Sequence, residues 1–83
     1  NYYMKEIWFL IAVMSLEKTD GTIEMHVNKD VTYASEQECQ SYIKENGLDF
    51  IRTVSETYGW DKPIRQILCI PEENLKKFSD YKK

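Results

Sequence analysis

The sequence lacks the features that mark a membrane span, a fibrous repeat or a disordered chain. Its longest apolar run, residues 7–14, is far shorter than the roughly 20 residues that a helix needs to cross a bilayer. Three glycines, two prolines and no biased tract exclude collagen-like and low-complexity chains. A net charge of −3 disfavours a general nucleic-acid-binding surface. We therefore expect one small globular domain over residues 1–83, with no nucleic-acid partner.

Motifs of catalysis, cofactor binding and metal ligation are lacking as well. The chain has no glycine-rich phosphate loop, nucleophile elbow, pair of catalytic carboxylates or metalloprotease signature. Two cysteines and one histidine do not have the close paired spacing of a zinc site. We therefore predict no catalytic residue, metal or cofactor, and favour a non-catalytic protein.

The apolar run at residues 7–14 is rich in β-branched and aromatic side chains and has no polar alternation. Such a run is typical of a strand buried on both faces, although a buried helix shares this pattern. Behind Lys5 it also resembles the core of a signal peptide, but Glu6 and Ser15-Leu16-Glu17 fit that interpretation poorly. Because the chain begins with Asn1, a processed or trimmed start stays open, and an export signal would lie upstream.

A second strand is expected at residues 22–28, after an Asp20-Gly21 pair that predicts a hairpin turn. Apolar and polar side chains alternate along it, as in a strand with one buried face. We expect the core face to carry Ile23, Met25 and Val27, and the solvent face to carry Glu24, His26 and Asn28.

A long helix is predicted from a capping box, Ser35-Glu36-Gln37-Glu38, to about Tyr58, with Gly59 as its stop. Asn46-Gly47 interrupts its apolar face, which keeps the same phase on both sides. One continuous helix is therefore favoured over two. The apolar face comprises Cys39, Tyr42, Ile43, Phe50, Ile51, Val54 and Tyr58.

Residues 63–70 predict a third strand, and Pro71 opens a short helix with Leu75 and Phe78 on its apolar edge. A helical crossover joins parallel strands, so the third strand runs parallel to the second and is placed beside the first. The expected fold is α+β, in the order ββαβ plus the short helix. Its antiparallel sheet has strand order 2-1-3, with the long helix on one face.

The sheet face opposite the long helix lacks sufficient cover in this arrangement. It would present alternate residues of the first strand, either Trp8, Leu10, Ala12 and Met14 or the set between them. Exposed apolar patches of this kind usually mark interfaces. We therefore expect a homodimer, with sheets face to face or strand edges paired, and keep a monomer covered by the short helix as the alternative.

The only two cysteines, Cys39 and Cys69, fall at the same end of this topology. A disulfide between them is favoured, and it would indicate an exported, periplasmic or viral protein. Two buried thiols in a cytoplasmic protein remain an alternative. A reactive Cys39 with a lowered pKa at the helix N-terminus is a third.

Two further residues are candidates for ligand contact. His26 shares a strand face with Glu24, which more often means two solvated side chains than a site. Trp60 either closes one end of the core or forms a ligand platform. A small-ligand-binding protein or enzyme with a pocket at the dimer seam, near Trp8, His26 and Trp60, is thus a second functional hypothesis. A third is an effector or inhibitor that binds a host protein through a sheet edge.

The combination of an apolar first strand, a half-polar second strand, Ser35-x-x-x-Cys39 at a helix start and Trp60 before a strand ending in Cys69 carries a resemblance. It resembles small exported two-cysteine bacterial or phage proteins of unknown function. The resemblance implies a compact disulfide-linked α+β domain. It implies no catalytic residue.

Overall fold

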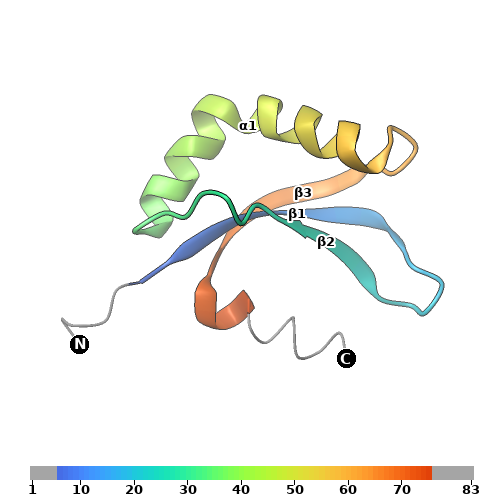
Figure 1. The fold of residues 1–83 in the computed structure, drawn as a ribbon, viewed down its shortest axis with the longest axis horizontal. Helices are drawn as coiled ribbons and strands as arrows, with labels where there is room; N and C mark the ends of the chain where they lie inside the picture. Colours follow the sequence, from blue (N-terminus) through green and yellow to red (C-terminus); the bar gives the residue numbers. More distant parts are fainter. Residues whose placement is uncertain (1–5, 76–83) are drawn as a thin grey trace.

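A computed structural model describes residues 6–75 of the chain. Its elements are, in order, β1 (Trp8–Glu17), β2 (Ile23–Val27), α1 (Glu36–Tyr58) and β3 (Ile64–Pro71). A helical turn follows at residues 72–75. The helix lies across one side of the sheet (Figure 1), which confirms the predicted α+β fold. Phe78, named for the apolar edge of the short helix, lies outside the described residues.

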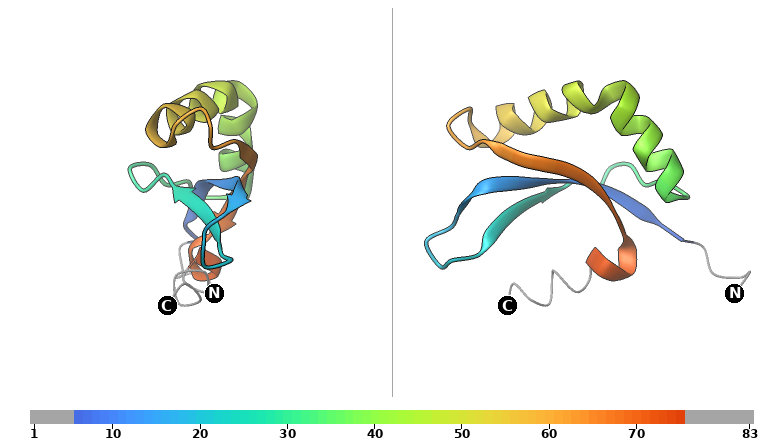
Figure 2. Two further views of the ribbon diagram at one scale, coloured as in Figure 1. Left: turned by 90° about the vertical axis from the view of Figure 1, so that its right-hand side faces the viewer. Right: turned by 180° about the vertical axis from the view of Figure 1, so that it is seen from behind.

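The sheet has the predicted strand order, β2-β1-β3, and both neighbouring pairs are antiparallel. Ile11 stands opposite Val27 on one side and Leu68 on the other. Leu10 stands opposite Cys69. The three strands twist together beneath the helix (Figure 2). This register determines which side chains share a face, because partners in a ladder point to the same side.

The hairpin between β1 and β2 forms at the predicted Asp20-Gly21 pair. Gly21 has a φ of 88°, which a residue with a side chain rarely adopts. The Asp20 carboxylate accepts hydrogen bonds from the Thr22 hydroxyl at 2.7 Å and the Thr22 amide at 3.0 Å. These bonds lower the pKa of Asp20. β1 extends to Glu17, three residues beyond the predicted strand.

The helix α1 is continuous, as favoured, and its ends are the predicted ones. At its start the Ser35 hydroxyl accepts from the Glu38 amide at 3.1 Å. At its end Gly59 has a φ of 99°, and its N–H donates to the Ser55 carbonyl at 2.8 Å. Gly47 is buried against β3, since a Cβ built there would lie 3.5 Å from both Ile43 and Ile67. The interruption in the apolar pattern is therefore the place where the helix approaches the sheet.

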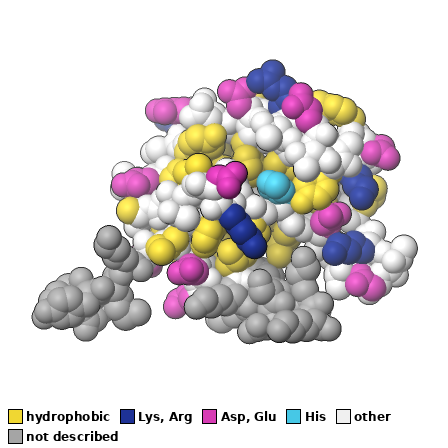
Figure 3. All heavy atoms as spheres, in the orientation of Figure 1, with side chains coloured by type: hydrophobic (Ala, Val, Ile, Leu, Met, Phe, Trp, Pro, Cys, Tyr) yellow, Lys and Arg dark blue, Asp and Glu magenta, His cyan; other side chains and the backbone are white. Residues whose placement is uncertain are grey.

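The faces of β2 are reversed relative to the prediction. His26 turns its ring toward α1, 5.4 Å from the ring of Tyr58 and 6.2 Å from that of Phe50. Ile23, Met25 and Val27 therefore point away from the helix. Around the single histidine, hydrophobic side chains reach the molecular surface (Figure 3). The alternation along β2 separates two faces correctly, but it does not show which one meets the helix.

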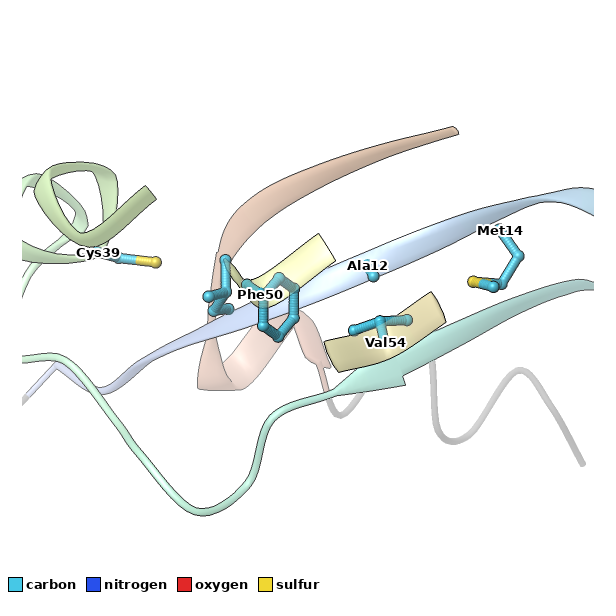
Figure 4. Packing of buried hydrophobic residues seen from close by; sticks show 6 residues of the cluster. Ala12, Met14, Cys39, Phe50 and Val54 are labelled. Atoms are coloured by element: carbon cyan, nitrogen blue, oxygen red, sulfur yellow. The ribbon is translucent and has the colours of Figure 1, made fainter. Parts of the chain in front are cut away.

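The core lies between α1 and the sheet, where side chains of both layers point toward one another (Figure 4). Its buried cluster comprises Leu10, Ala12, Met14, Cys39, Phe50 and Val54, with Trp8 half-buried against it. The residues first named for an open interface, Trp8, Leu10, Ala12 and Met14, are thus on the helix-covered face, and that assignment is wrong. Both residue sets of β1 are apolar, so its sequence carries no mark of which one the helix covers.

Candidate interaction surface

The sheet face away from α1, which we call the open face, is apolar across all three strands. Its ladder partners and the alternation along each strand place eight side chains on it. They are Phe9, Ile11, Val13, Ile23, Met25, Val27, Leu68 and Ile70. A groove of about 400 Å³ runs along this face, and most of these side chains line it. The open face is the set that the prediction gave as the alternate residues of β1, extended across both neighbours.

Some side chains of the open face are buried from solvent and the others are partly exposed. Ile11, on the central strand and between its partners Val27 and Leu68, is fully buried. Ile70 is 7% exposed, and the other six side chains are half-buried. The turn at residues 72–75 lies on this side of the sheet, at one end (Figure 1). Within the described residues, most of the open face therefore has no covering layer.

The rim of the groove differs from its floor. Gly21, Thr22, Arg65 and Gln66 complete its lining. Arg65 is the only charged residue among them, and it is exposed. A surface with an apolar floor and a sparsely charged rim can lie against another apolar surface without burying an unpaired charge.

His26 belongs to a polar seam on the other side of the sheet, between β2 and the end of α1. Its Nδ1 lies 3.1 Å from the Tyr58 hydroxyl, at hydrogen-bond distance. Burial raises the pKa of Tyr58, and the nearby Glu24 carboxylate adds to the shift. Glu24 itself lies 4.0 Å from the Lys62 amino group. These contacts with Tyr58 and Phe50 account for His26 as a packing residue.

Trp60 does not close the end of the core, because 71% of its surface is exposed. The groove on the open face is lined by neither Trp60, Trp8 nor His26. The structure therefore does not bring these three residues together in the groove, which lies on the other side of the sheet from Trp8 and His26.

The two cysteines come together as predicted. The sulfur atoms of Cys39 and Cys69 lie at disulfide distance, and their Cα atoms are 6.1 Å apart. Cys39 is fully buried in the first turn of α1, and Cys69 stands beside Leu10 in the sheet. Neither cysteine is free. On the chain-entropy model, closing a loop of this length contributes about 3.5–4 kcal/mol to stability.

Other functional features are limited within residues 6–75. No helix there has the length and hydropathy to cross a membrane. In the same part of the chain, no group of three or more His, Cys, Asp and Glu side chains is arranged to hold a metal ion. In comparisons with protein-family models, curated proteins and solved structures, nothing matches the chain. Its own surfaces must therefore indicate what it does.

Proposed function

We propose that the protein is a non-catalytic assembly module, and that the open face of its sheet binds the same face of a second copy. The observation that carries this proposal is an apolar sheet face with a groove of about 400 Å³ and no covering layer among the described residues. Uncovered sheet faces of this kind in soluble proteins are commonly buried by another layer.

The small core supports the same conclusion. Only ten of the 70 described residues are buried, and all but two of the eight open-face side chains are half-exposed. A domain of this size buries a modest share of its surface alone, and association with a second copy is one way to increase it.

A second copy matches the open face in apolar character and in charge. Two sheets stack about 10 Å apart when their apolar side chains interdigitate. The exposed position of Arg65 at the rim leaves the apolar floor of the groove free of charge. Two identical faces related by a two-fold axis therefore meet apolar against apolar.

The experiment is a mass measurement by light scattering after size exclusion, on the full chain and over a range of concentrations. Met25→Glu places a carboxylate on the open face and is expected to halve the mass of the assembly. Leu16→Glu is the control, because Leu16 is 57% exposed and does not line the groove. A wild-type chain that is monomeric throughout, or a Met25→Glu chain of unchanged mass, contradicts the proposal.

The cysteine pair supports a second part of the proposal, which is that the protein works in an oxidising compartment. Disulfides persist in exported and periplasmic proteins and on virion surfaces, and are rare in reducing cytosol. The Cys39–Cys69 pair lies within the core rather than at an exposed redox site, so its role is structural.

A further inference from the structure

The outer edge of β3 is a second surface at which another chain could pair. The strand order makes β3 an edge strand. One side of β3 is hydrogen-bonded to β1. The hydrogen bonds of β1 show which residues of β3 take part. Trp8 exchanges backbone hydrogen bonds with Tyr33, and the Leu10 carbonyl accepts from the Asn28 amide, so both residues direct their backbone groups toward the β2 side.

The residues between them must therefore bond to β3, because backbone groups alternate in direction along a strand. The Ile7 carbonyl agrees, since it accepts from the amide of Glu72 just beyond β3. Ladder partners then place the backbone groups of Leu68 and Ile70 toward β1. Those of Ile67 and Cys69 point outward, to the free edge.

This edge has little of the protection that edge strands usually carry. Charged side chains, prolines and bulges normally block the pairing of an exposed edge with another chain. In β3 the register irregularity and Arg65 are at the start, and Pro71 is the last residue. The stretch 66–70 between them contains neither a charge nor a proline.

An apolar strip of α1 lies above the same edge. Ile43, Gly47, Leu48 and Ile51 of the helix line a depression of about 480 Å³ together with Ile67 of β3. Leu48 is 83% exposed. A strand added to β3 would direct alternate side chains toward this strip and cover it. From behind, β3 is seen in front of the other strands with α1 above it (Figure 2).

We propose that this edge pairs with β3 of a second copy, antiparallel and about a two-fold axis at Leu68. In that register Ile67 stands opposite Cys69 of the partner subunit, and both have outward N–H and C=O groups. A six-stranded sheet results, with the two helices on one side and their apolar strips facing each other. Lys44, Glu45 and Asp49 also line the depression, so each copy brings one basic and two acidic side chains to the axis.

Edge pairing uses a different surface from the open face and does not depend on it. A chain that uses both surfaces forms assemblies larger than a dimer, and the loss of either interface reduces them to the dimer held by the other.

Amide hydrogen exchange tests the edge directly on the full chain. The Leu68 and Ile70 amides are bonded within the domain and are expected to exchange slowly at every concentration. The Ile67 and Cys69 amides are expected to exchange at least about tenfold more slowly in the assembled protein than in the diluted monomer. Pairing through the open face alone leaves these two amides unprotected.

Leu48→Lys adds a charge to the strip and is expected to abolish the concentration-dependent protection, whereas Leu16→Lys, at an exposed site outside the strip, leaves it intact. Fast exchange of Ile67 and Cys69 in a chain of proven dimeric mass would overturn edge pairing while leaving the open-face proposal standing. Protection that persists in the monomer would overturn it as well.

Discussion

The two faces of the sheet are nearly equal in apolar composition and very different in burial. On the covered face, the β1 side chains Leu10, Ala12 and Met14 are at most 2% exposed. On the open face of the same strand, Ile11 is fully buried, but Phe9 and Val13 on either side of it are only half-buried. The residues of β1 therefore do not determine which face is buried. The position of the crossover helix does, together with the disulfide that holds the helix there. An apolar strand supplies two candidate interfaces, and the connection determines which one becomes the core.

The largest loss of stability is expected from removing the disulfide that holds α1 against β3. Replacing both cysteines, Cys39→Ser with Cys69→Ser, removes a covalent link and is expected to lower the free energy of unfolding by about 3.5–4 kcal/mol. Chemical denaturation of the wild type with and without reductant measures the same loss. Identical unfolding midpoints in the two conditions, or free thiols in the mass spectrum, would contradict the pairing.

A direct contrast between the faces comes from one leucine on each. Leu10→Ala empties a fully buried site and is expected to cost about 2–5 kcal/mol. Leu68→Ala, on the half-exposed open face, is expected to cost about 1 kcal/mol when unfolding is measured at a concentration where the chain is monomeric. Equal costs would mean that the open face is already covered within one chain.

The smallest effect concerns two tyrosines. Tyr58→Phe removes the hydrogen bond to His26 and is expected to cost about 0.5–1.5 kcal/mol. Tyr33→Phe is the matched control, because the Tyr33 hydroxyl is buried without a partner among the described residues, and its loss is expected to be neutral or slightly stabilising. Thermal or chemical unfolding distinguishes the two, and a costlier Tyr33→Phe would contradict this interpretation.

The same two tyrosines make the stability of the domain depend on pH at the alkaline end. Burial raises the pKa of both Tyr33 and Tyr58 above the usual value. The unfolded chain therefore releases these protons first, and the free energy of unfolding falls as the pH rises past about 10. Below that range both tyrosines are neutral in either state and contribute no slope.

Local signals in the sequence were sufficient for the elements and their order. The Asp20-Gly21 turn, the Ser35 cap and the Gly59 stop all require particular backbone geometry or short-range hydrogen bonds, which the residues specify by themselves. The proximity of Cys39 and Cys69 followed from topology alone. These predictions are confirmed because none of them depends on knowing which way a strand faces.

The facing of the strands was not specified locally, although one constraint would have determined it. Cys69 must point to the helix to reach Cys39, and its ladder partner Leu10 then points there too. That pairing assigns Leu10, Ala12 and Met14 to the core. The orientation of β2 needs the next ladder as well, since His26 shares a face with Ala12. Register, rather than hydropathy, carries this information.

The bond between Cys39 and Cys69 encloses most of α1 and the exposed segment around Trp60 that leads into β3. A protease that cuts this segment would separate the backbone into two pieces, each of which retains one of the two cysteines. The pieces would remain a single covalent molecule until a reductant separates them. If the protein works in an oxidising compartment, as proposed, such a chain can be cut in this exposed connection and still keep β3 in its sheet.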